Sequence, residues 1–305
     1  MSSVNGETGP VEHTVRLGGS DLHYWVYGAA TTVRRSDARA PVVMIHGLRG
    51  THHGLELIAE HFPERTVVIP DLPGFGDSGP MRQRQHDVEG YAQLVTELVE
   101  HLGGRDRPVL LLGHSFGSLV AARAARLAPE PVWRLVLVNP ISTPALRGPR
   151  VVLSRLTSVY YRLGKALPPR VGRALLSNRG IVLAASAAMV RSRDKRVRRF
   201  VHGSHLRYFS RFHSPALLSE TYEASVTHTV AEYAAGLDTP TLLIAGAEDD
   251  IAPVHGQRRL AAELTDAELT VIPDVGHLVH YETPVAASRA IQRFLDAREE
   301  EEARQ

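Results

Sequence analysis

The stretch Val109-Leu110-Leu111-Leu112-Gly113-His114-Ser115-Phe116-Gly117-Ser118 decides the fold of this chain. Four apolar residues typical of a buried strand lead into a turn with Ser115 at its apex, and residues 118–122 then read as a helix. A serine at such a strand-to-helix turn has strained backbone angles, and glycines two residues away on either side leave room for the strand and the helix. The pattern G-x-S-x-G predicts a nucleophile elbow; a glycine-rich turn with a capping serine is the alternative.

A candidate acid and a candidate base follow Ser115, each after a strand-like segment. Asp249 comes after the apolar run 241–246, and His277 comes after the run 269–273. A serine hydroxyl needs an adjacent base to become a good nucleophile, and a carboxylate orients that base. Ser115, Asp249 and His277 are therefore the candidate catalytic residues, with Asp250 and Asp274 as rival acids.

Two more segments match a known family. Residues 46–50, His-Gly-Leu-Arg-Gly, resemble an oxyanion loop, and residues 71–78, Asp-Leu-Pro-Gly-Phe-Gly-Asp-Ser, resemble a D-x-P-G-x-G-x-S loop. Together with the elbow and the order Ser, Asp, His, they make the chain resemble the α/β-hydrolase fold superfamily. The resemblance covers the first part and the last part of the chain and fades between them.

The resemblance implies roles for particular residues. It favours Asp249 as the acid because Gly246, Asp249 and Pro253 match the family pattern G-x-x-D-x-x-x-P. It also implies that the backbone N–H groups of Leu48 and Phe116 form the oxyanion hole. Phe116 follows the serine at the start of a helix, where its N–H is free, whereas Leu48 is assigned from its place in the loop.

Strand-like and helix-like segments alternate along the first half of the chain. Expected helices lie near 52–62, 88–102 and 117–128, with Asp87 as an N-cap, and expected strands lie at 13–17, 22–27, 42–46, 67–70, 109–112 and 134–139. The first two strands read as an antiparallel edge pair. This alternation predicts an α/β fold with a mostly parallel, doubly wound sheet.

The strand pattern stops after Pro140 and resumes at Thr241. So long an interval suits an inserted helical cap better than a loop. We therefore expect a cap at 141–236 inserted in a hydrolase core formed by 1–140 and 237–305. Helical spacing within the cap predicts a helix whose apolar face carries Val152, Leu153, Leu156, Val159, Tyr160 and Leu163.

Composition narrows the class of protein. The 305 residues carry a net charge of only +2, which argues against a nucleic-acid partner, and no apolar run is long enough to span a membrane. The N-terminus lacks the features of a secretory signal, so the cytoplasm is the default location. Sixteen histidines occur without an evident carboxylate or cysteine cluster, and we expect neither a metal nor a cofactor.

The densest charge cluster lies at 191–199, where six of nine residues are basic. One interpretation is a solvated helix face. The other is that this segment, with Arg49, favours an acidic substrate or a membrane surface.

These features predict a serine hydrolase that cleaves a small carboxylic ester or related acyl substrate through an acyl-enzyme. A serine nucleophile argues against epoxide hydrolases and haloalkane dehalogenases, which use aspartate at the elbow. Two alternative functions use the same triad: a carbon–carbon bond hydrolase and an acyltransferase. An alternative of a different class is a protein with this fold that binds a ligand without catalysis.

Overall fold

A computed structural model describes residues 9–28, 39–144 and 151–303 of the chain. Its centre is an eight-stranded sheet in the spatial order β1-β2-β4-β3-β5-β6-β7-β8. The strands are β1 (Val11–Leu17), β2 (Ser20–Tyr27), β3 (Val42–Ile45), β4 (Val67–Pro70), β5 (Val109–His114), β6 (Val132–Val138), β7 (Thr241–Gly246) and β8 (Ala267–Ile272). β2 pairs antiparallel with β1 and β4, and the other neighbours pair parallel. The mostly parallel α/β sheet is confirmed.

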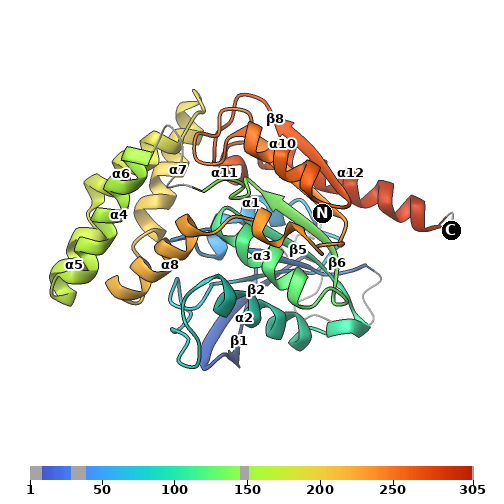
Figure 1. Cartoon of the computed structure of the whole chain (residues 1–305), viewed down its shortest axis with the longest axis horizontal. Helices are drawn as coiled ribbons and strands as arrows, with labels where there is room; N and C mark the ends of the chain where they lie inside the picture. The colour runs from blue at the N-terminus through green and yellow to red at the C-terminus, as the bar shows by residue number, and fades with distance from the viewer. Residues whose placement is uncertain (1–8, 29–38, 145–150, 304–305) are drawn as a thin grey trace, which may run out of the picture.

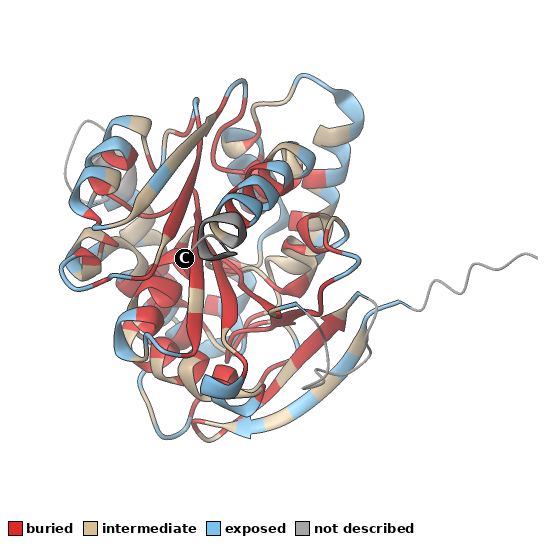
Figure 2. Cartoon of the chain, turned by 90° about the vertical axis from the view of Figure 1, so that its right-hand side faces the viewer, coloured by how far each residue is buried: buried red, intermediate tan, exposed pale blue. Residues whose placement is uncertain are grey.

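Helices cover both faces of the sheet, which explains why its central strands are apolar throughout. Successive side chains of a strand point to opposite faces, so Val43 and Ile45 join one buried cluster while Val42 and Met44 join the other. The first cluster includes side chains of α2 and α3, and the second includes side chains of α1 and α12. Figure 2 shows the buried strands between helices whose outer faces are exposed.

The helices and turns of the sheet-forming part are η1 (His52–Gly54), α1 (Glu56–Ala59), α2 (Val88–His101), η2 (Gly104–Asp106), α3 (Phe116–Leu127), α10 (Val254–Glu263), α11 (Val279–Glu282) and α12 (Pro284–Ala303). Asp87 caps α2 as predicted, since its carboxylate accepts a hydrogen bond from Gly90 N at 2.8 Å. The single helix expected at 52–62 is wrong: Leu55, at φ −112° and ψ 0°, separates η1 from a short α1.

Between β6 and β7 the described residues form six helices: α4 (Val151–Ala166), α5 (Pro169–Leu176), α6 (Arg179–Met189), α7 (Lys195–Tyr208), α8 (Pro215–Thr227) and α9 (Ala231–Ala234). Figure 1 shows α4, α5 and α6 at one side of the molecule, away from the C-terminal helix α12. Within the described ranges, no helix has both the length and the apolar character needed to cross a membrane.

The residues of the predicted apolar face of α4 lie on a helix, but only Tyr160 among its described side chains is partly buried against the core. The side chains of Val152 and Leu153 lie outside the described part of the structure. Leu156, Val159 and Leu163 are 61%, 59% and 49% exposed. α4 packs instead through Tyr161, which is buried and stacks on Tyr222 of α8 at 4.1 Å between ring centroids. Periodicity therefore identified the helix but not the face that packs.

Candidate active site

Ser115 lies in a sharp turn between β5 and α3, with φ 53° and ψ −120°. A Cβ atom on Gly113 would lie 2.2 Å from Gly117 O, and one on Gly117 would lie 2.3 Å from Ile45 O. Any side chain at either position would collide with main-chain atoms, so the two glycines permit the strand and the helix to approach. The turn has the geometry of a nucleophile elbow, and it leaves Ser115 half-buried.

The structure brings Ser115, His277 and Asp249 together in one hydrogen-bonded chain. Ser115 Oγ lies 2.8 Å from His277 Nε2, and His277 Nδ1 lies 2.8 Å from Asp249 Oδ2. The acceptor on Asp249 fixes the proton on Nδ1 and leaves Nε2 free to accept from the serine hydroxyl. Both His277 and Asp249 are buried.

Asp249 is held ionised by its surroundings. Burial alone would raise the pKa of this carboxyl, but His277 and the N–H groups of Ala252 and Ile251 outweigh burial and lower the pKa below its usual value. The two N–H groups donate to Oδ1 at 2.9 and 2.8 Å. A buried carboxylate with these donors can stabilise a charged imidazolium next to it.

Asn139 also belongs to this network, and the sequence interpretation missed it. Its Nδ2 donates to Asp249 Oδ2 at 2.8 Å and to Gly276 O at 3.3 Å. Asn139 follows β6 in a left-handed conformation with φ 47°, which asparagine tolerates better than most residues. Its position at the carboxyl end of a parallel strand, next to the strand that leads to Asp249, was the available signal.

Two free N–H donors lie beside the elbow. A Cβ on Gly47 would lie 3.2 Å from Ser115 Cβ, so the loop that carries Leu48 packs directly on the serine. Phe116 is the first residue of α3. Among the described residues, neither the Leu48 N–H nor the Phe116 N–H has a hydrogen-bond acceptor.

Two further buried histidines, His114 and His280, form a packed row that ends at His277. The ring of His114 lies 5.4 Å from the His277 ring and 3.9 Å from the His280 ring, and its Nε2–H donates to His277 O at 3.2 Å. Burial lowers the pKa of His114 to about 3 and lowers the pKa of His280 well below its usual value. Both rings are therefore neutral at pH 7; His114 packs beside His277, and His280 packs on His114.

One histidine group does have a carboxylate beside it, contrary to the sequence interpretation. The possible ligand atoms of His52, His53 and Glu56 lie within 4.8 Å of one another. However, His52 Nδ1 is paired with Asp71 at 2.9 Å, and Glu56 accepts from His53 and from Tyr27 OH. Because these carboxylates already have partners, we assign the group no metal role.

Arg49 is not available to an acidic substrate. It is 8% exposed, and it donates from Nε to Phe209 O at 2.9 Å and from Nη2 to Leu176 O at 2.7 Å. Both acceptors belong to the inserted helices or their connections. Arg49 therefore ties that segment to the loop that carries Leu48.

The residues of the basic run 191–199 lie in two different environments. Arg191 pairs with Asp250, and its backbone N–H donates to the carboxylate of Glu282 at 3.0 Å. Arg193, just before α7, and Lys195, Arg196 and Arg199, in its first turns, are exposed. Most of the run thus lies on a solvated helix face.

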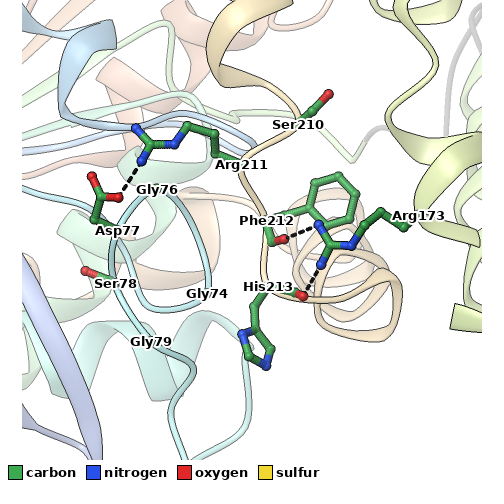
Figure 3. Close-up of a pocket in the computed structure, with 10 residues that line it drawn as sticks. All are labelled: Gly74, Gly76, Asp77, Ser78, Gly79, Arg173, Ser210, Arg211, Phe212 and His213. Carbon is green, nitrogen blue, oxygen red and sulfur yellow. Dashed lines mark hydrogen bonds and ion pairs between the residues drawn. The ribbon is translucent and has the colours of Figure 1, made fainter. Parts of the chain in front are cut away.

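A pocket of about 330 Å³ lies where the connection between α7 and α8 meets the loop at 71–79 (Figure 3). Arg211 pairs with Asp77 there, and Arg173 donates to the main-chain oxygens of Phe212 and His213. Neither Ser115 nor another residue of the hydrogen-bonded chain lines this pocket. Its arginines are already paired, so the pocket is a point of attachment and not the candidate catalytic site.

Comparison with known proteins identifies the family. Residues 40–284 match the alpha/beta hydrolase fold, and the chain belongs to that family. It is 36% identical to lipase LipV of Mycobacterium tuberculosis over 133 residues, which are 43% of this chain and 45% of LipV. It is 25% identical to the uncharacterized hydrolase YugF of Bacillus subtilis over 86% of this chain and 92% of YugF. A thermophilic esterase from Thermogutta terrifontis superposes with a TM-score of 0.72 at 20% identity, over 94% of this chain and 98% of the esterase.

Proposed function

We propose that this protein is a serine esterase that cleaves a carboxylic ester or related acyl compound through the triad Ser115, His277 and Asp249. The observation that carries the proposal is the hydrogen-bonded chain from Ser115 Oγ through both ring nitrogens of His277 to Asp249, with 2.8 Å at each step. The family membership and the lipase and esterase relatives support the same chemistry.

In the proposed reaction, His277 Nε2 takes the proton of Ser115 as Oγ attacks the acyl carbon. Asp249 stabilises the imidazolium through Nδ1. The Nε2 proton then passes to the alcohol oxygen as the ester bond breaks, which leaves an acyl-enzyme. Water, deprotonated by His277 Nε2, attacks that acyl group; His277 then returns the proton to Ser115 Oγ as the bond to the acyl carbon breaks and the acid leaves.

The backbone N–H groups of Leu48 and Phe116 are the proposed oxyanion hole. Both lie next to Ser115 and have no other acceptor among the described residues. The Phe116 N–H also lies at the positive end of the α3 dipole. Fixed donors aimed at a developing oxyanion contribute on the order of a hundredfold or more to the rate.

The inserted segment, residues 141–236, is the proposed cap, and residues 1–140 and 237–305 are the proposed core. Arg49 and the pairing of Arg211 with Asp77 hold this segment against the loops beside Ser115. In this position the cap helices would shape the acyl-binding pocket.

The test is hydrolysis of p-nitrophenyl esters from acetate to decanoate by the native protein and by Ser115→Ala. We expect turnover that falls by about four orders of magnitude or more in Ser115→Ala, with an acyl-length optimum that sizes the pocket. Ser210→Ala is the matched control, because Ser210 lines the pocket of Figure 3 and not the elbow, and it should keep native turnover.

Labelling by a fluorophosphonate provides a second readout. The native protein and Ser210→Ala should be labelled at Ser115, and Ser115→Ala should not. Absence of both turnover and labelling in folded native protein would reject the esterase proposal and leave a ligand-binding role. Labelling without ester turnover would point to a carbon–carbon or acyl-transfer substrate.

A further inference from the structure

The helices α4, α5 and α6 expose apolar side chains that the rest of the fold does not cover. Of the ten exposed large apolar side chains in the described part of the chain, seven lie on α4 to α7. On α4, Leu156, Val159 and Leu163 form one stripe, because residues three and seven positions apart share a face of a helix. Scattered exposed apolar residues are ordinary, but a concentration on one element marks an interaction surface.

The next two helices also expose apolar side chains. Val171 of α5 is 51% exposed, and Ile181 and Leu183 of α6 are 39% and 41% exposed. Figure 1 shows α4, α5 and α6 on the side of α7 and α8 that faces away from the sheet. We call these six side chains the outer apolar surface: Leu156, Val159, Leu163, Val171, Ile181 and Leu183.

The same segment is strongly basic. Residues 141–236 contain 16 Arg and Lys and four Asp and Glu, a formal charge of +12, whereas the other residues contain 19 and 29, a formal charge of −10. No Asp or Glu occurs from residue 131 to residue 193. The small net charge of the whole chain therefore conceals two parts of opposite sign.

Basic side chains lie on the same helices as the exposed apolar side chains. Arg155 and Arg162 are exposed on α4, and Arg170 and Arg179 are exposed at the ends of neighbouring helices. Among the described residues, none of these four arginines forms an ion pair. An apolar stripe flanked by unpaired arginines is the pattern of a helix that lies in the interface of a membrane.

We propose that the outer apolar surface, with Arg155, Arg162, Arg170 and Arg179, binds the surface of an anionic lipid bilayer. Leu156, Val159 and Leu163 enter the boundary between headgroups and acyl chains, while the arginines contact lipid phosphates. A second copy of this chain fits less well, because it would bring +12 against +12. Nucleic acid would satisfy the charge but not the apolar stripe.

Vesicle co-sedimentation tests the proposal with the Ser115→Ala protein, so that lipid hydrolysis cannot affect the result. We expect binding to vesicles with one third phosphatidylglycerol to be at least about tenfold tighter than binding to pure phosphatidylcholine, and weaker in 0.5 M NaCl. Equal binding to both vesicles, or binding to neither, would overturn the proposal.

The apolar contribution is tested by the triple change Leu156→Ser, Val159→Ser and Leu163→Ser. We expect at least about a tenfold loss of binding to the anionic vesicles. The control is Leu127→Ser with Val285→Ser, which removes exposed apolar side chains outside the inserted segment and should leave binding within about twofold. Equal losses in both variants would overturn the assignment to α4.

The charge contribution is tested by Arg155→Glu with Arg162→Glu, against Arg258→Glu with Arg259→Glu on α10. Each pair of changes replaces two arginines by two glutamates, so both variants change the net charge equally. All four arginines are exposed, so the changes are comparable in their surroundings. Only the α4 pair should reduce vesicle binding by about tenfold or more. Equal losses in the two pairs would show a nonspecific effect of charge and would overturn the proposal. The proposal would also fail if the native protein is a dimer, binds no vesicles, and becomes a monomer after the α4 triple change. That result would assign the surface to a second copy of the chain.

Discussion

Asp249 and Asp250 have the same functional group and adjacent places in the chain, but the fold gives them different environments. Asp249 is 4% exposed and accepts hydrogen bonds from His277, Asn139 and two backbone N–H groups. Asp250 pairs with Arg191 at the surface. Only Asp249 lies within hydrogen-bond distance of His277, and the family pattern in the sequence had favoured the same residue.

We therefore expect Asp249→Asn and Asp250→Asn to differ sharply. Asp249→Asn should lower kcat by on the order of a thousandfold to ten-thousandfold, because His277 loses its charged acceptor and its preferred tautomer. Asp250→Asn removes a partly exposed ion pair, a change of about 1 kcal/mol or less, and should leave kcat near the native value. Ester hydrolysis by the two variants measures the difference, and equal losses would contradict the assignment of the acid.

Asn139 is a positioning residue for the same carboxylate. Asn139→Ala removes the donor to Asp249 Oδ2 and the donor to Gly276 O, and places alanine at φ 47°. We expect kcat to fall by about tenfold to a hundredfold, since a hydrogen bond to a charged group contributes about 1.5–3 kcal/mol. The acidic limb of the kcat against pH profile should also move to a different pH. A stability loss with an unmoved profile would show that Asn139 has only a structural role.

At the scale of elements, α6 and α7 are joined by a buried polar contact. Ser186 Oγ lies 2.7 Å from the Nδ1 atoms of both His202 and His205. His205 is fully buried, stacks on Phe209 at 4.0 Å, and has a pKa that burial lowers to about 3. The contact therefore depends on a histidine that stays neutral in the folded protein.

This contact predicts that acid weakens the fold well before the carboxylates are protonated. Below pH 6.5 the unfolded chain gains a proton at His205 that the folded chain does not accept until about pH 3, so stability falls as pH falls through this range. We expect His205 to account for about 2 kcal/mol of loss between pH 7.5 and pH 5.

Urea unfolding at several pH values checks this prediction. His205→Asn should flatten the pH dependence by about 2 kcal/mol over that range, since asparagine does not titrate. Ser186→Ala should lower stability at every pH without changing the slope, because it removes a hydrogen bond and not the buried histidine. An unchanged slope in His205→Asn would mean that other groups cause the acid sensitivity.

For the whole molecule, Arg49 is one of several polar links between the sheet-forming part and the inserted helices, beside the pairs Arg211–Asp77 and Arg191–Asp250. Its guanidinium donates to Phe209 O and Leu176 O and lies 5.8 Å from the ring centres of Phe209 and Phe212. A lysine at this position offers a single ammonium and cannot reproduce this fork. The part of the attachment next to the Leu48 loop therefore depends on one planar side chain.

We expect Arg49→Lys to lower the free energy of unfolding by about 1–3 kcal/mol and to speed proteolysis within 141–236. Arg123→Lys is the control, because Arg123 pairs with Glu89 at the surface and its replacement should cost less than about 1 kcal/mol. Urea unfolding and limited trypsin digestion followed by mass spectrometry measure both effects. Similar cleavage of the two variants would show that Arg49 does not hold the segment in place.

The sequence by itself determined the sheet, the elbow and the order of the candidate catalytic residues. These features depend on local rules: strands and helices have fixed periods, and the turn at Ser115 requires glycines at 113 and 117. Only the tertiary structure decided that Asn139 supports Asp249, that His52 pairs with Asp71, and that α4 turns Leu156, Val159 and Leu163 outward. The reason is that periodicity defines the apolar face of a helix, whereas packing between segments distant in the chain decides which face is covered.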